Sequence, residues 1–291
     1  MRCKRTYHFA DGKELVLGGR TLIMGILNVT PDSFSDGGQW NTLAKAKEHV
    51  KQMVADGADL IDIGAESTSS WRPGWTPLTA EEEQARLLPY LRAIVPESPV
   101  PISVDTYHAA TARAAAACGV HILNDVWGLQ YAGEPRGAMA QVAAETELPI
   151  IVMHNQEDKA YTGDVIACMQ DFFRRSLAIA NAAGVKRDNI ILDPGIGFGK
   201  DTPTNLLVQR RLRELTVLDG EVYPLLLACS RKRFIGDVLN LPSDQRDIAT
   251  GAAGVVGILQ DACMLRVHDV QTMAQMARLT DAIRLAGQEE D

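Results

Sequence analysis

The stretch TLIMGIL, from Thr21 to Leu27, is a short apolar run, and the polar residue Asn28 follows it directly. The run lacks the alternation of a strand with one wet face, so it predicts a strand that is buried on both faces, as in a parallel sheet. Seven similar runs follow along the chain: Asp59–Ile63, Pro101–Val104, Val120–Leu123, Pro149–Met153, Asn189–Leu192, Tyr223–Ala228 and Ala262–Val267. The sequence therefore predicts eight buried strands.

Helical patterns with start and stop signals lie between these runs. Thr79 and Glu82 have the spacing of a capping box ahead of a helix that reaches Ile94, and Gly119 and Gly184 follow two further patterns. The expected helices begin after Asn41 or Thr42, span 79–94, 107–118 and 164–183, begin again near Pro203, and span 243–259 and 270–286.

The alternation of strands and helices predicts an α/β fold, a (β/α)8 TIM barrel, with a doubly wound open sheet as the alternative. We expect one domain over residues 1–291, with a lead-in at 1–20 and a frayed tail at 287–291.

Composition limits the classes of partner. The 291 residues carry a formal net charge of −8 and no basic run, which argues against nucleic acid. No apolar stretch approaches the length of a membrane span. The five cysteines are odd in number and scattered, which is typical of reduced thiols in a cytoplasmic protein.

Polar residues follow the predicted strands at their carboxyl ends, which share one rim in a barrel. Loops are polar in general, but the enzymes of this fold place their sites at this rim. Asp105, Asn124 and Asp193 offer groups that can read the donor–acceptor edge of a flat heterocycle. The cationic side chains Lys232 and Arg266, together with Arg231, His268 and Arg72, suit a phosphate or diphosphate.

Two other site types lack support. The segment IGFGK, which ends at Lys200, resembles a phosphate loop, but Pro194 and Asp201 stand where that loop needs glycine and a hydroxyl residue. The histidines lack HxxxH spacing and there are no cysteine pairs, so a tight zinc site is not expected. Any Mg²⁺ would be held loosely, by one protein oxygen, diphosphate and water.

Several segments resemble the signatures of the dihydropteroate synthase family. Gly25–Gly38 (GILNVTPDSFSDGG) resembles the first signature, and Asp62–Thr68 (DIGAEST) followed by Arg72-Pro73-Gly74 resembles the second. Five more segments match in order: Ile102–Thr106, Asn124–Asp125, Leu192–Gly195, Ser230–Lys232 and Arg266–His268.

The resemblance implies a pterin-binding barrel, a target of sulfonamides, that condenses a dihydropterin methyl diphosphate with 4-aminobenzoate in folate biosynthesis. It implies catalytic roles for Asp105, Asp193 and Lys232. The pterin would be held by Asp105, Asn124, Met153, Asp193, Phe198 and Lys232. The diphosphate would be bound by Asn28, Arg72, Arg266 and His268, with Mg²⁺ at Asn28. Aminobenzoate would be surrounded by Phe34, Thr68, Pro73 and Ser230. It also suggests a homodimer.

Two alternatives remain open from the sequence: a methyltetrahydrofolate–corrinoid methyltransferase and a pterin-binding paralogue without turnover. The methyltransferase should not need the cations of Ser230–Lys232 and Arg266–His268. One departure from the family pattern is the insertion of Ser69-Ser70-Trp71 between Thr68 and Arg72. We hypothesise that it changes the discrimination between aminobenzoate and sulfonamides.

Overall fold

The computed structural model describes residues 2–29, 43–66, 76–156 and 160–287. Eight parallel strands form one sheet in the order β11-β12-β3-β4-β5-β6-β7-β8. Their bounds are β3 Leu22–Asn28, β4 Leu60–Gly64, β5 Ile102–Asp105, β6 Ile122–Asp125, β7 Ile150–Met153, β8 Ile190–Asp193, β11 Leu226–Leu227 and β12 Met264–Val267. The sheet closes where Leu192 pairs with Leu225 and donates a hydrogen bond to the carbonyl of Pro224 (2.9 Å). The predicted barrel and its eight strands are confirmed, and the open sheet is wrong.

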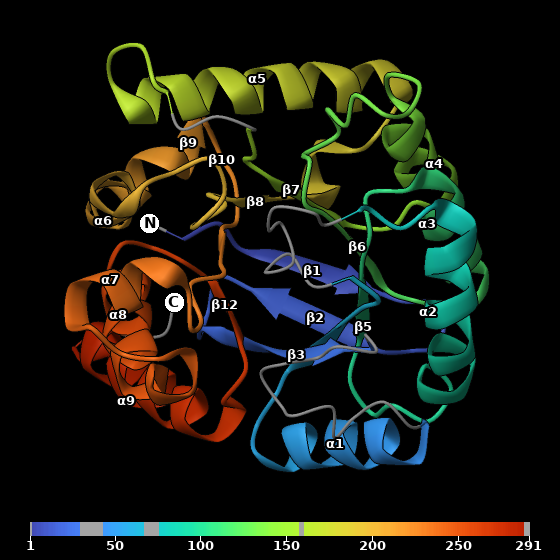
Figure 1. Cartoon of the computed structure of the whole chain (residues 1–291), viewed down its shortest axis with the longest axis horizontal. Helices are drawn as coiled ribbons and strands as arrows, with labels where there is room; N and C mark the ends of the chain where they lie inside the picture. Colours follow the sequence, from blue (N-terminus) through green and yellow to red (C-terminus); the bar gives the residue numbers. More distant parts are fainter. Residues whose placement is uncertain (1, 30–42, 67–75, 157–159, 288–291) are drawn as a thin grey trace.

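Helices surround the sheet (Figure 1). They are α1 Leu43–Ala55, α2 Ala80–Ile94, α3 Ala109–Ala117, α4 Ala138–Thr146, α5 Val165–Ala183, α6 Thr202–Arg210, α7 Arg233–Leu239, α8 Asp247–Leu259 and α9 Val270–Leu285. The capping box of Thr79 and Glu82 is confirmed at the start of α2. The sequence patterns missed α4 and α7, which are short helices of nine and seven residues. The helix expected from Ser243 is a short 3₁₀ turn, Ser243–Gln245, followed by α8.

The two faces of each barrel strand meet different surroundings. On β4, Ile61 and Ile63 belong to the core between sheet and helices, whereas Leu60 belongs to a second cluster inside the barrel. The same inner cluster contains Met24, Ile122, Ile151, Ile191, Leu226 and Met264. The amino-terminal half of the barrel interior is therefore filled with apolar side chains, and it is a packed core rather than a channel.

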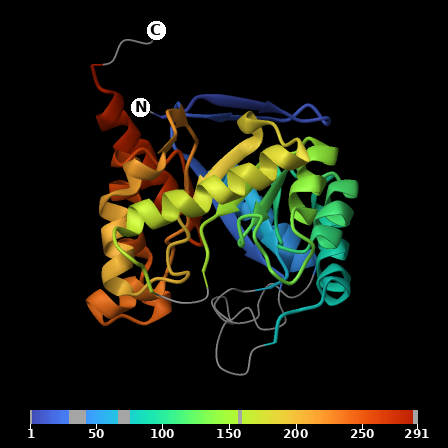
Figure 2. The ribbon, with the colours of Figure 1, turned by 90° about the horizontal axis from the view of Figure 1, so that it is seen from above.

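The first residues of the chain close the amino-terminal end of the barrel. β1 (Arg5–His8) and β2 (Glu14–Leu17) pair as an antiparallel hairpin, which Figure 2 shows lying across one end of the molecule. Leu15 and Leu17 pack into the inner cluster. The expected lead-in is thus a plug, and the opposite end of the barrel is the one left for a site.

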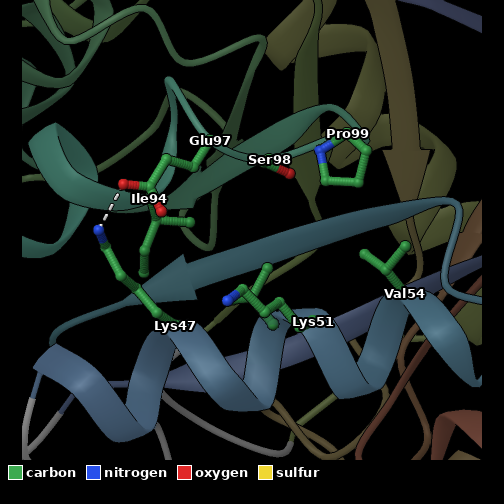
Figure 3. Close-up of a pocket in the computed structure, with 8 residues that line it drawn as sticks. Lys47, Lys51, Val54, Ile94, Glu97, Ser98 and Pro99 are labelled. Atoms are coloured by element: carbon green, nitrogen blue, oxygen red, sulfur yellow. Dashed lines mark hydrogen bonds and ion pairs between the residues drawn. The ribbon is translucent and has the colours of Figure 1, made fainter.

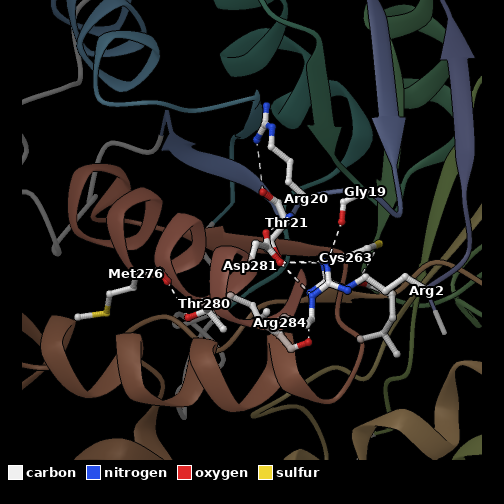
Figure 4. Close-up of polar contacts among 11 residues, drawn as sticks. Arg2, Gly19, Arg20, Thr21, Cys263, Met276, Thr280, Asp281 and Arg284 are labelled. Atoms are coloured by element: carbon white, nitrogen blue, oxygen red, sulfur yellow. Dashed lines mark hydrogen bonds and ion pairs between the residues drawn. The ribbon is translucent and has the colours of Figure 1, made fainter. Parts of the chain in front are cut away.

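Buried polar contacts fasten this plug to the last helix (Figure 4). The Arg2 guanidinium pairs with Asp281 of α9 (3.3 Å) and donates to the carbonyl of Ile258 (3.1 Å). The backbone N–H of Thr21, just before β3, donates to the same Asp281 carboxylate. Helix α9 thereby sets the starting point of β3. No described helix is long and apolar enough to cross a membrane.

Candidate active site

The barrel interior changes from apolar to polar toward the carboxyl ends of the strands. Residues two positions apart on a strand face the same side. Leu60 is followed inward by Asp62, Ile122 by Asn124, Ile151 by Met153, Ile191 by Asp193, and Met264 by Arg266. The register then sets Asp105 beside Asn124, and Met153 beside Asp193. The strands thus bring five of the predicted site residues, Asp105, Asn124, Met153, Asp193 and Arg266, to one end of the barrel.

A network of charged side chains crosses this end. Arg266 donates from Nε to Asp62 Oδ2 (2.6 Å) and from Nη2 to Asp105 Oδ2 (2.8 Å). Asn124 Nδ2 donates to the same oxygen of Asp62 (3.0 Å). The sequence interpretation assigned Asp105 to a heterocycle and Arg266 to a phosphate, but the two side chains are paired, and the Arg266 guanidinium lies between two carboxylates.

Asp62 is the residue that the sequence interpretation missed. Its side chain is fully buried, and its Oδ1 has no hydrogen-bond partner among the described residues. Burying a carboxylate is costly unless it is paired and hydrogen-bonded. The sequence did carry a signal for Asp62, because it is a charged residue at an inward position of the apolar run DLIDI. A strand with only a structural role would have an apolar residue at that position.

Burial shifts the protonation equilibria of the site. Removal from water raises the pKa of Asp105 to about 7, against the opposing charge of Arg266. It raises the pKa of Asp193 to about 6, against a backbone hydrogen bond from Gly195 and the charge of Lys232. Removal from water and the charge of Arg266 lower the pKa of Lys232 to about 8. Such shifts cluster at functional sites.

Lys232 and Phe198 form one side of the site. The Lys232 ammonium lies 4.4 Å from the centroid of the Phe198 ring, within the range of a cation–π contact. Phe198 and Met153 belong to a third buried cluster with Tyr107 and Val126. An apolar wall therefore stands beside the acids and the amide, as a flat heterocycle requires.

Ser230 and His268 meet just after the carboxyl ends of β11 and β12. Ser230 Oγ lies 2.9 Å from His268 Nδ1 and accepts a hydrogen bond from the His268 backbone N–H (3.2 Å). Burial, helped by the charge of Arg231, lowers the pKa of His268 to about 3. The imidazole is therefore neutral at pH 7 and offers hydrogen-bonding nitrogens rather than a charge. Arg231 itself is paired with Asp247 (2.7 Å).

Asn28 ends β3 at this same end of the barrel and is half-buried. The described residues contain no group of three or more His, Cys, Asp or Glu side chains that could hold a metal ion. Four predicted site residues, Phe34, Thr68, Arg72 and Pro73, lie outside the described residues, as does the insertion Ser69-Ser70-Trp71.

A groove on the outer layer is separate from this site (Figure 3). It is lined by Lys47, Val50, Lys51 and Val54 of α1 and by Ile94, Glu97, Ser98 and Pro99 at the end of α2. Lys47 and Glu97 form an ion pair across it (2.6 Å). It contains none of the predicted site residues.

Comparisons with known proteins agree with this geometry. The pterin binding enzyme family matches residues 24–268. The dihydropteroate synthase of Bacillus subtilis (strain 168) is 48% identical over 264 residues, which are 91% of this chain and 89% of that protein.

Two crystal structures of dihydropteroate synthases superpose closely. The enzyme of Clostridium difficile, determined in the presence of pteroic acid, has a TM-score of 0.84 and 46% identity, over 92% of this chain and 98% of that one. The Yersinia pestis enzyme with a sulfonamide drug has a TM-score of 0.87 and 38% identity, over 97% and 100%. The chain therefore belongs to the dihydropteroate synthase family of pterin-binding enzymes and is a transferase of folate biosynthesis.

Proposed function

We propose that the carboxyl end of this barrel binds (7,8-dihydropterin-6-yl)methyl diphosphate and joins it to 4-aminobenzoate, releasing diphosphate and 7,8-dihydropteroate. One observation carries the assignment of residues. Buried acids and an amide (Asp62, Asp105, Asn124 and Asp193) converge on one end of the barrel interior together with Arg266 and beside Lys232.

The acids and the amide recognise the pterin edge. Asn124 Nδ2 is committed to Asp62, which leaves Oδ1 of Asn124 as an acceptor for a ligand N–H. Asp105 and Asp193 accept further N–H groups of the aminopyrimidinone ring, while Met153 and Phe198 line its faces. Lys232 donates to the acceptor atoms of the ring. Asp62 therefore orients Asn124 as well as pairing with Arg266.

The same residues stabilise the charges that develop during the reaction. When the bond from the exocyclic carbon to diphosphate breaks, positive charge grows on the pterin methylene group, and the carboxylates of Asp105 and Asp193 stabilise it. Arg266 and the N–H of neutral His268 stabilise the leaving diphosphate. The amine of aminobenzoate then forms the new C–N bond and loses a proton. No nucleophilic side chain is needed.

Mg²⁺ fits this site only as a loosely held ion. Asn28 would supply a single amide oxygen, and the described residues contain no group of three or more His, Cys, Asp or Glu side chains that could hold the ion. Mg²⁺ often keeps several waters and binds through substrate phosphates, so one protein oxygen is compatible with it. When bound, it would neutralise charge on the diphosphate. Arg72 is assigned to the same diphosphate by family resemblance alone.

Aminobenzoate lies beside Ser230 in this proposal, with Phe34, Thr68 and Pro73 completing its site. The Ser230 hydroxyl is fixed by its contacts with His268. Ser230 therefore links the aminobenzoate and diphosphate subsites.

The test is diphosphate release, measured with the dihydropterin diphosphate, Mg²⁺ and aminobenzoate. Release that depends on aminobenzoate is the expected result. Pterin binding without release would support the paralogue without turnover and overturn the proposal. Asp193→Asn serves as the matched variant, because it keeps the side-chain shape and removes the charge; we expect it to abolish most of the release.

We also propose that residues 1–291 form one cytoplasmic domain that pairs as a homodimer. The five cysteines are free thiols, as in the reducing cytoplasm.

Ile248 of α8 is 80% exposed, and Leu279 and Ile283 of α9 are 65% and 68% exposed. These apolar side chains favour a second copy as the partner of α8 and α9. Ile283→Lys should convert a dimer to a monomer in light scattering; an unchanged mass would overturn this interface.

A further inference from the structure

Lys200, at the end of the segment that resembles a phosphate loop, is a buried cation with no role in the proposed reaction. Its residue is 3% exposed. Its Nζ donates to the carbonyls of Gly195 and Phe198, both at 3.0 Å, and lies 2.9 Å from Nδ1 of His154. The three N–H donors of an ammonium thus meet three acceptors, all of them inside the protein.

His154 is suited to accept one of these bonds. Burial and the charge of Lys200 lower the pKa of His154 to about 2, so the ring is neutral and Nδ1 is available as an acceptor. The His154 backbone N–H donates to the carbonyl of Asp193 (2.9 Å). Lys200 therefore connects the end of β7 to the segment that follows β8.

That segment carries two groups of the proposed pterin site. The backbone N–H of Gly195 donates to Asp193 Oδ1 (2.7 Å), which fixes the carboxylate. Phe198 lies three residues further on, against Lys232. A cation that binds the carbonyls of both Gly195 and Phe198 spans the whole turn between them.

We propose that Lys200 is a positioning residue for the pterin substrate: its ammonium holds the turn 195–198 so that Asp193 and Phe198 keep the geometry that the pterin requires. This inference rests on the proposed function of the site. Lys200 does not touch the substrate, because its donors are used on His154 and the two carbonyls.

The burial of this charge supports a positional role. Removal from water lowers the pKa of Lys200 to about 7, so burial disfavours its charge, and the three acceptors around Nζ are what stabilise the ammonium. An apolar side chain would fill the same space without that cost but would leave two buried carbonyls unpaired. The fold therefore requires hydrogen-bond donors, rather than an apolar side chain, at position 200.

Two further hydrogen bonds hold the turn 195–198 and the residue that follows it. Tyr161 donates from its hydroxyl to the carbonyl of Gly199 (2.9 Å), and the Gly197 N–H donates to Asn205 Oδ1 (2.7 Å). Tyr161→Phe therefore provides a mild version of the same perturbation in a side chain that is only partly buried.

The experiment compares Lys200→Met, which keeps an unbranched side chain one atom shorter and removes the donors, with Lys200→Gln, which supplies two N–H donors. We expect Lys200→Met to raise the KM for the pterin diphosphate on the order of tenfold or more, since small misplacement of binding groups has large effects. The KM for aminobenzoate should change far less. Lys200→Gln and Tyr161→Phe should show smaller shifts of the same kind. Lys186→Met, at an exposed lysine paired with Glu147, is the matched control and should match the unaltered chain.

A purely structural role gives a different pattern. Loss of folded protein lowers the maximal rate and leaves both KM values unchanged, and that result for Lys200→Met and Tyr161→Phe would overturn the inference. Equal rises in both KM values would also overturn it. If the unaltered chain releases no diphosphate, the proposed function fails instead, so the two failures are distinguishable.

Discussion

Arg266 and Asp62 are 204 residues apart in the sequence, yet Nε of Arg266 lies 2.6 Å from Oδ2 of Asp62 inside the barrel. The second and last strands of the barrel, β4 and β12, carry them, and both flank β3. Because the same oxygen of Asp62 also accepts from Asn124, one buried carboxylate joins the diphosphate and pterin parts of the proposed site.

Replacing Asp62 by asparagine tests this junction. Asp62→Asn keeps the shape but removes the charge that faces Arg266 and allows the Asn124 amide to turn. We expect kcat/KM for the pterin diphosphate to fall on the order of 10- to 100-fold, because the binding groups lose their fixed orientation. Steady-state kinetics measure this. The control is Asp171→Asn, at an exposed carboxylate, and its kinetics should match those of the unaltered chain. Equal kinetics in the two variants would contradict the role of Asp62.

The pH dependence follows from the shifted pKa values. In the proposed reaction, Asp105 and Asp193 must be ionised to bind the pterin N–H groups and stabilise positive charge, so we expect activity to be lost as pH falls through their pKa values of about 7 and about 6. Lys232 must be protonated, so activity is lost as pH rises through about 8. We expect a bell-shaped profile of kcat/KM, which reports on the free enzyme.

Lys232→Arg separates the two limbs of this profile. Arginine does not titrate in this range, so the loss of activity through about pH 8 should disappear, while the acidic limb and the loss caused by deprotonation of Lys200 near pH 7 stay. The overall rate should drop, because a guanidinium does not reproduce the position of the ammonium. An alkaline limb that persists near pH 8 in this variant would show that another group causes it.

The barrel could be predicted from the sequence because each buried parallel strand appears in it as a continuous apolar run. Each apolar run is short and ends on a polar residue, so Asn28, Asp105 and Asp193 mark strand ends without knowledge of contacts. The sequence marks Asp62 as a charge within an apolar run, but that its side chain faces inward follows from the register of β4. Helix α7 is only seven residues long, too short for a clear helical pattern in the sequence. The partners of Arg266 could not be predicted at all, because pairing across the barrel depends on closure of the sheet.

The turn after β8 depends on glycine at position 195. Gly195 has φ of +61°, and an added Cβ would lie 1.9 Å from the carbonyl oxygen of His154. Gly184 also has positive φ, but nothing lies within 4 Å of its added Cβ. Gly184→Ala should cost only the backbone strain, about 1–2 kcal/mol of unfolding free energy. Gly195→Ala should cost clearly more and should weaken pterin binding. Urea unfolding and pterin titration measure both; equal costs would contradict the clash.

The attachment of the hairpin plug to α9 predicts a stability effect that is separate from catalysis. Asp281 pairs with the buried Arg2 and accepts from the Thr21 backbone, so Asp281→Ala leaves a buried guanidinium and a buried N–H without their partner. Removing one partner of a buried ion pair typically costs about 3–5 kcal/mol, and we expect a loss of that order in urea unfolding. The KM values of the folded fraction should not change, because the plug lies at the opposite end of the barrel from the site.

The control for this prediction is a second aspartate that also holds the hairpin. Asp188 pairs with Arg5 of β1 (2.9 Å), but its side chain is 64% exposed. The Asp188 carboxylate stays in water although the Arg5 side chain is only 20% exposed, so water screens this pair and competes for its hydrogen bonds, and we expect it to contribute about 1 kcal/mol. Asp188→Ala should therefore unfold almost like the unaltered chain. If the two variants lost the same stability, burial of the Arg2–Asp281 pair would not be the reason that the plug stays in place.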